Sequence, residues 1–203
     1  MPDVYATARG RVRARLASPL AARARARRHA AFFALTGLGP GMRIVDVGCG
    51  TLGLRGLEPD LDVTGVDLVA RPQYPGPFVQ ADATKRLPFE DGAFDLAYSS
   101  SVIEHLAPAD RPAFAREVRR VARGFFVQTP AWSFPIEPHA LLPFAHWLPP
   151  ELRRRYWRLG AAGSWEDIAL LRRAELAALF GEPVHAERFA GLVKSWIALR
   201  PAA

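Results

Sequence analysis

The sequence has almost no cysteine and no long hydrophobic run. Cys49 is the one cysteine among 203 residues, which excludes an internal disulfide and a cysteine-based metal cluster. Its place between two glycines, with no histidine nearby in the sequence, favours a small packing residue over a nucleophile. The longest apolar runs, such as Ala30–Leu35, are too short to span a bilayer. No signal-peptide pattern opens the chain, so we expect a cytoplasmic protein without a transmembrane segment.

Acidic residues are missing from one long stretch. Between Asp3 and Asp46 there are nine arginines and no acid, in a chain of net charge +7. Such a segment could contact anionic lipid, nucleic acid or an acidic substrate. Aromatic side chains for base stacking are not interleaved with these arginines, which argues against nucleic acid. We expect residues 1–40 to form an Ala/Arg-rich helical cap with a solvated face, and peripheral membrane contact is the alternative.

A short apolar run and a glycine-rich loop come directly after the basic segment. Ile44–Val47 reads as a buried strand, and Gly48, Gly50 and Gly53 follow it. Glycine lets the backbone turn tightly and lets a ligand approach the main chain. The pattern fits a dinucleotide site, a site for S-adenosylmethionine (SAM) or a plain turn. Asp46 would repel phosphates and attract an ammonium group, which favours SAM.

Acidic and hydroxyl residues follow the next strands in the same way. Asp67 ends the second predicted strand, Asp82 follows the third, and Ser99 follows the fourth. If the strands are parallel, these termini lie on one edge of the sheet, where ligands bind in open α/β folds. The predicted strands are Arg43–Val47, Asp62–Asp67, Phe78–Ala81, Ala93–Tyr98, Gly124–Gln128, Val184–Phe189 and Leu192–Leu199, the last two antiparallel. The predicted helices are Leu52–Leu57, Pro112–Val121 and Arg172–Phe180.

Residues 130–165 change character. They contain four of the five tryptophans, further aromatics, two histidines and several prolines, which excludes a long helix or a regular strand. Long irregular excursions in compact domains tend to be lids or binding loops, and a second hydrophobic cluster is the alternative. We therefore expect a single domain over residues 1–203 with a substrate-binding excursion or lid at 130–165.

Together these residues resemble a known family. The stretches Val45–Thr51, Gly65–Asp67, Gln80–Ala83 with Leu87–Phe89, Phe94–Ala97 and Ser101–Leu106 are similar, in order and spacing, to class I SAM-dependent methyltransferases of the small type 11-like group. The resemblance covers about residues 43–128. It implies an α/β fold, a Rossmann-like doubly wound seven-stranded sheet, mostly parallel with one antiparallel strand, and an aromatic-rich insertion after the fifth strand.

The resemblance also implies roles for individual residues. Gly48 and Gly50 let the loop approach the methionine part of SAM, and Asp46 helps to hold its amino group. Asp67 binds the ribose hydroxyls, Asp82 and Ala83 meet the adenine, and Ser99 borders the methyl-bearing sulfonium. The chain departs from the family at Leu52, where a glycine is usual and Gly53 comes one residue later.

The expected function is methyl transfer from SAM to oxygen or nitrogen of a small, partly apolar acceptor by in-line displacement. His139, with Glu137 to orient it, is the candidate general base, and we read His105 as structural. We expect no metal site, although Glu137, His139 and His146 have conceivable ligand types. The alternatives are a non-catalytic SAM- or nucleotide-binding module and a nucleic-acid methyltransferase that uses the basic N-terminus.

Overall fold

The computed structural model describes residues 30, 32–162, 165 and 167–202. The chain divides into two compact units: unit 1 comprises residues 1–33 and 134–167, and unit 2 comprises residues 34–133 and 168–203. Most of the predicted N-terminal helical cap lies outside the described residues. Among the described residues no helix is long and apolar enough to cross a membrane.

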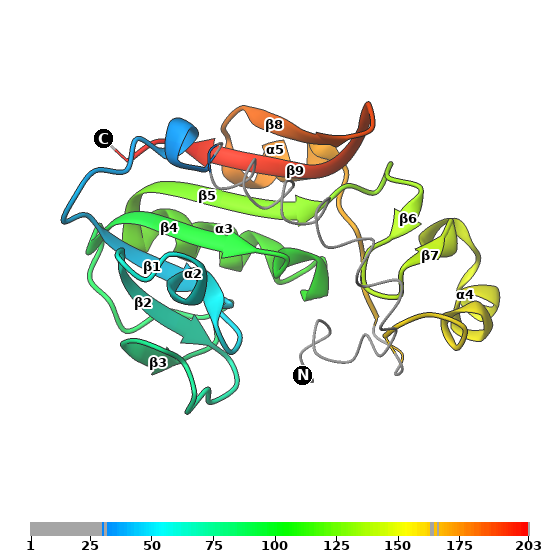
Figure 1. Cartoon of the computed structure of the whole chain (residues 1–203), viewed down its shortest axis with the longest axis horizontal. Helices are drawn as coiled ribbons and strands as arrows, with labels where there is room; N and C mark the ends of the chain where they lie inside the picture. The colour runs from blue at the N-terminus through cyan, green and yellow to red at the C-terminus, as the bar shows by residue number, and fades with distance from the viewer. Residues whose placement is uncertain (1–29, 31, 163–164, 166, 203) are drawn as a thin grey trace. The chain divides into compact units, whose positions relative to one another are not determined.

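Unit 2 is built on a seven-stranded sheet of order β3-β2-β1-β4-β5-β9-β8 (Figure 1). Its strands are β1 (Arg43–Val47), β2 (Asp62–Asp67), β3 (Phe78–Gln80), β4 (Phe94–Ser100), β5 (Ala122–Pro130), β8 (Val184–Phe189) and β9 (Leu192–Arg200). Neighbouring strands from β3 to β5 pair in parallel, whereas β9 pairs antiparallel with both β5 and β8. The predicted fold class, with a single antiparallel strand, is therefore confirmed.

Helices cover both faces of this sheet. Figure 1 shows α2 (Gly53–Leu57) in front of the sheet, and α3 (Arg111–Val121) and α5 (Arg173–Phe180) behind it. The predicted apolar face of α3 is buried through Phe114, Val118 and Val121. Truncating a fully buried Phe such as Phe114 would cost about 3–5 kcal/mol. Because β1 and β4 are covered on both sides, nearly all of their side chains are buried, without the alternation of a half-exposed strand.

Two strand ends differ from the sequence prediction. β4 continues through Ser100, since Ser99 and Ser100 pair with Val127 and Gln128 of β5. Ser99 therefore does not follow the strand, as the sequence suggested, but lies inside it. β3 ends at Gln80, and Asp82 stands two residues beyond it in a turn.

Unit 1 holds only short elements in its described part. They are β6 (Ile136–Glu137), β7 (Leu142–Pro143), the 3-10 turn η2 (Ala145–Trp147) and α4 (Pro150–Trp157). β6 and β7 form a two-stranded antiparallel hairpin, and both it and α4 pack against η2. Prolines mark two of their boundaries: one ends β7, and another occupies the first position of α4, where its missing N–H is tolerated.

Candidate cofactor-binding site

The glycine-rich loop is folded back over the end of the neighbouring strand. The N–H groups of Gly48 and Cys49 both donate to the carbonyl oxygen of Val66, at 2.7 and 3.1 Å. Gly48 has φ +79°, and a Cβ there would lie 2.3 Å from a methyl group of Val102. The position thus requires glycine both for its left-handed backbone and for space. The conformation of the loop is therefore defined by its contacts with Val66 and Val102, both in unit 2.

Asp46 lies beneath this loop and is nearly inaccessible, at 2 % exposure. Its Oδ2 accepts a hydrogen bond from the Leu54 N–H at 2.6 Å. The pKa of Asp46 is raised to about 7, because burial and, to a smaller extent, the charge of Asp67 raise it more than the Leu54 hydrogen bond lowers it. A Cβ on Gly53 would stand 2.3 Å from Oδ2, so Gly53 supplies the space for this carboxylate. That accounts for a glycine one position later than the family pattern has it.

Asp67 joins the end of β2 to the loop. Its Oδ2 accepts the Gly50 N–H at 2.9 Å, and its Oδ1 accepts the Val69 N–H at 2.9 Å. The structure thus brings together Asp67 and Gly50, which are 17 residues apart in the sequence. Arg71 also reaches both carboxylate oxygens, each at 3.3 Å. Sequence reasoning missed Arg71, because nothing in a proline-rich loop marks one arginine as a partner of a strand-end aspartate.

Asp82 and Ala83 lie in the turn after β3. Oδ1 of Asp82 accepts hydrogen bonds from the N–H and the hydroxyl of Thr84, at 2.9 and 2.6 Å, and Lys85 lies 3.6 Å from Oδ2. The hydrogen bonds from Thr84 hold the pKa of Asp82 below its usual value. Asp82 is therefore an ionised acceptor in a fixed orientation, which is a property that recognition of an exocyclic amine needs.

Ser99 has a different environment from the one expected. It is buried at 1 % exposure, and its hydroxyl donates to the carbonyl oxygen of Val47 at 2.9 Å. Ser99 thus ties the end of β1 to β4. The residues at the actual end of β4 are Ser100, whose hydroxyl donates to Oε1 of Gln128 at 2.7 Å, and Ser101, which has φ +57°. A left-handed serine at this sheet edge is a strained position of the kind that clusters at functional sites.

Tyr74 is a second residue that sequence reasoning missed. It is buried, and a Cβ added to Gly65 or Gly53 would come within 2.6 or 3.1 Å of its ring. Burial, followed by the charge of Asp46, raises the pKa of Tyr74 above its usual value. A cavity of about 440 Å³ is lined by residues between positions 70 and 80, Arg71, Tyr74 and Gln80 among them. The Tyr74 ring therefore packs closely against Gly53 of the glycine loop and Gly65 of β2.

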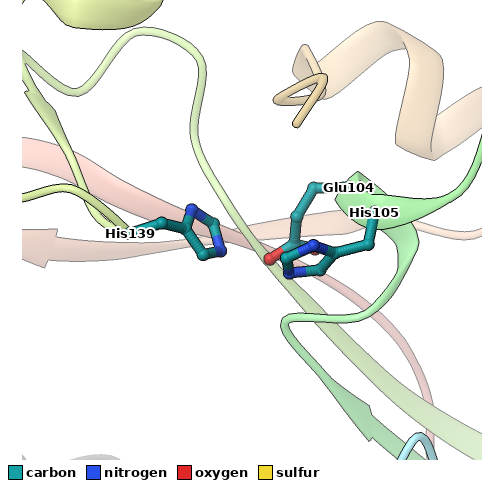
Figure 2. Close-up of side chains that lie close together, drawn as sticks. All are labelled: Glu104, His105 and His139. Carbon is teal, nitrogen blue, oxygen red and sulfur yellow. The ribbon is translucent and has the colours of Figure 1, made fainter. Parts of the chain in front are cut away.

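His139, the candidate base, and His105, which we read as structural, belong to different units. His105 belongs to η1 (Ile103–His105) in unit 2, next to the buried Glu104, and His139 belongs to unit 1; Figure 2 draws all three side chains. Within unit 2, Oε2 of Glu104 accepts the Thr129 hydroxyl at 2.9 Å, which fixes η1 to the end of β5.

Within unit 1, Nδ1 of His139 lies 2.8 Å from Oε1 of Glu137. Glu137 is buried, and its Oε2 accepts the Ala140 N–H at 2.6 Å. Burial raises the pKa of Glu137, but the hydrogen bonds from His139 and Ala140 outweigh it, so the pKa lies below its usual value. The expected orienting contact between Glu137 and His139 is therefore present.

Comparison with known proteins agrees with this geometry. Residues 45–125 match the profile of a family described as a methyltransferase domain, type 11. None of the curated proteins matches the chain. Among solved structures, a Pyrococcus horikoshii protein is 19 % identical with a TM-score of 0.61, and the match covers 99 % of this chain and 94 % of that one.

Two further solved structures are similar. A SAM-dependent methyltransferase from Methanosarcina mazei is 19 % identical, with a TM-score of 0.53 and coverage of 80 % of this chain and 92 % of that one. The 1,6-didemethyltoxoflavin N1-methyltransferase of Burkholderia thailandensis, solved with S-adenosylhomocysteine, is 16 % identical, with a TM-score of 0.53 and coverage of 80 % and 72 %. At these identities the similarity shows the fold, while the family profile confirms the predicted resemblance.

Proposed function

We propose that this chain, whose residues 45–125 match a methyltransferase domain, transfers a methyl group from SAM to a small, partly apolar acceptor. The observation that carries the proposal is the hydrogen bond between Gly50 and Asp67, which fixes an acidic side chain and an open glycine backbone side by side. A Cβ on Gly50 would meet nothing within 4 Å. The space above Gly50 is thus open to a ligand that approaches the main chain.

The residues of unit 2 suit the parts of SAM one by one. Gly48 and Gly50 present backbone to the methionine part, and Asp46 offers a negative charge to its ammonium group. Asp67 can accept the ribose hydroxyls, for which Arg71 must share or release one carboxylate oxygen. Asp82, with Ala83 beside it, is the acceptor for the adenine amine. Ser99 we assign to positioning the end of β1 through its bond to Val47.

Bound SAM supplies a methyl group already activated on a sulfonium, so the protein contributes mainly orientation. The loop held by Asp46 and Asp67 fixes where the methyl group points. An oxygen or nitrogen acceptor loses a proton as it is methylated, and we propose His139 as the base that takes it. The Glu137 carboxylate supports this role because it fixes the imidazole and stabilises its protonated form.

The acceptor class is proposed from unit 1 and from relatives. The segment 134–167 is rich in aromatic side chains, which suits an acceptor with apolar parts. The Burkholderia thailandensis enzyme was solved with 1,6-didemethyltoxoflavin, a small molecule, as its acceptor. Methylation of a small molecule at oxygen or nitrogen is therefore our proposal for this chain.

Isothermal titration tests the cofactor assignment. We expect SAM and S-adenosylhomocysteine to bind in the micromolar range, and NAD not to bind. Asp67→Ala should weaken SAM binding about tenfold or more, because two hydrogen bonds to a charged group are lost. Asp60→Ala, an exposed aspartate just before β2, is the matched control and should bind as the parent does.

Four outcomes would contradict the proposal at different points. Tight NAD binding without SAM binding would overturn the cofactor assignment. An Asp67→Ala variant that binds like the parent would remove the ribose role. SAM binding without any S-adenosylhomocysteine formed over broad acceptor panels would indicate a non-catalytic binding module. Activity that survives His139→Ala would remove the base.

A further inference from the structure

The β6–β7 hairpin has its polarity inverted. Its inward positions are Glu137 and Leu142, and its outward positions are Ile136 and Pro143. The carboxylate is the buried side chain, satisfied by the Ala140 N–H and His139, while the outward face carries no polar side chain. A hairpin on a protein surface usually shows the reverse pattern, with polar side chains toward water. The outward face of this hairpin is thus suited to contact with an apolar surface rather than with water.

The exposed apolar surface continues around the hairpin. Its large side chains are Ile136 (40 % exposed), Leu141 (63 %), Phe144 (51 %) and Trp147 (42 %), and together with Pro143 we call them the apolar hairpin face. The rings of Phe144 and Trp147 are in contact, with centroids 5.3 Å apart. Contiguous exposed apolar patches are uncommon on a monomer and mark sites of interaction.

The backbone is strained where this face is most exposed. Leu141 has φ +55° and Phe144 has φ +61°, in the left-handed region that bulky residues rarely adopt. The fold therefore sustains an energetic cost that points two large apolar side chains outward rather than into a core. Strain of this kind is retained where it serves binding.

A basic helix adjoins the apolar hairpin face. α4 packs against η2 and carries Arg153, Arg154 and Arg155, with Arg158 directly after it, against one acid, Glu151. Arg153 and Arg154 lie over the ring of Trp165, at 5.1 and 5.6 Å from its centroid. Arg155 and Arg158 are exposed. Apolar side chains beside tryptophan and arginine are the composition that binds the interface of an anionic bilayer.

We propose that the apolar hairpin face of unit 1 inserts into the surface of an anionic lipid bilayer, with the exposed Arg155 of α4 and Arg158 after it at the headgroups. The proposal does not depend on methyl transfer, because it uses none of the residues assigned to SAM. It differs from membrane contact through the Arg-rich N-terminus in the residues that carry it. The charge of α4 favours lipid over a second copy of the chain, whose own α4 would bring like charge.

Vesicle co-sedimentation of the full chain tests this surface. The parent should bind vesicles of phosphatidylcholine mixed with phosphatidylglycerol, and bind phosphatidylcholine alone more weakly. In the double variant Leu141→Asn/Phe144→Asn, the affinity for anionic vesicles should fall about tenfold or more. Asparagine tolerates a left-handed backbone, so this variant should retain its cooperative thermal unfolding. Arg155→Gln/Arg158→Gln should weaken binding to anionic vesicles and reduce its dependence on salt.

A matched control removes two other exposed apolar residues. Phe189 and Leu192 flank the turn between β8 and β9 and are 50 % and 51 % exposed, so Phe189→Asn/Leu192→Asn should bind vesicles as the parent does. A parent that does not bind anionic vesicles overturns the proposal. So does a Leu141→Asn/Phe144→Asn variant that binds like the parent, which would assign binding to the basic N-terminal segment. If light scattering shows a dimer that only Leu141→Asn/Phe144→Asn dissociates, and this variant still binds vesicles like the parent, the apolar hairpin face is a contact between two copies of the chain and the lipid proposal is wrong.

Discussion

Each unit of the molecule contains a deeply buried carboxylate whose pKa is shifted, and these two pKa values move in opposite directions. Asp46 in unit 2 and Glu137 in unit 1 are 2 % and 1 % exposed. Burial raises the pKa of Asp46 to about 7, whereas the pKa of Glu137 lies below its usual value. Burial is thus not what distinguishes the two. The difference is that Glu137 has a histidine and a backbone N–H as partners, while Asp46 has one N–H and a second aspartate nearby.

This difference distinguishes a carboxylate with a structural role from one suited to binding a ligand. Glu137 is satisfied by its own hairpin, so ionisation stabilises unit 1. Asp46 is under-satisfied when ionised, and a cationic group above the loop would relieve that cost. Perturbed carboxylates of the second kind are the ones expected at functional sites. The comparison therefore supports Asp46, rather than Glu137, as the carboxylate whose charge acts on the SAM ammonium group.

The largest expected effect is on Asp46. Its folded pKa, about 7, is above the ordinary value of 3.8, so its contribution to stability is fully present below pH 3.8 and is lost as the pH rises through 7. Over that window the loss amounts to about 4 kcal/mol at most. In Asp46→Asn, whose amide oxygen can still accept the Leu54 N–H, this loss should be missing while SAM binding weakens. Urea unfolding across pH 4–8, without ligand, measures the first effect, and titration calorimetry measures the second.

Saturating SAM provides the control for that experiment. A cation beside Asp46 favours its ionised form, so SAM should move the titration of the parent to lower pH and should leave the Asp46→Asn profile unchanged. If the parent and the variant show the same dependence on pH, Asp46 is not the unsatisfied group that the comparison requires.

The next effect concerns the space that Asp46 occupies. Gly53 and Gly50 have similar left-handed backbones, with φ +54° and +59°, but only at Gly53 would a Cβ meet the carboxylate. Gly53→Ala should therefore lower the free energy of unfolding by about 3 kcal/mol, through strain and a clash together, and Gly50→Ala by about 1 kcal/mol, through strain alone. Equal losses in chemical denaturation would show that the Asp46 pocket tolerates a methyl group.

Much of the sheet and of the loop could be predicted because their signals are local. Apolar runs identify β1 and β2, and the apolar period identifies α3, since a few neighbouring residues decide each. The meeting of Gly50 and Asp67 follows from parallel strands that end at the same edge. These inferences need only the order of the strands.

What the sequence could not predict depends on distant pairing. The end of β4 is set by its pairing with β5, which places Ser99 inside the strand. Arg71 and Tyr74 reach the loop because the chain after β2 folds back, with the Gly65 N–H donating to the Pro77 carbonyl. The inverted hairpin has strands of two residues, too short for any period to show.

The smallest expected effect is on Glu137, and its sign is opposite to that of Asp46. Because the folded pKa of Glu137 lies below its ordinary value of 4.5, its contribution to stability is present above pH 4.5 and is lost as the pH falls through the folded value. Glu137→Gln keeps an acceptor for the Ala140 N–H but removes the charge, so it should cost about 1–2 kcal/mol at pH 7 and progressively less in acid. Fluorescence of the tryptophans of unit 1, followed during urea unfolding at pH 7 and in acid, measures this loss. If the stability of Glu137→Gln relative to the parent instead increases as the pH rises from 4 to 7, the ionised Glu137 is as poorly satisfied as Asp46. The distinction between the two carboxylates would then be wrong.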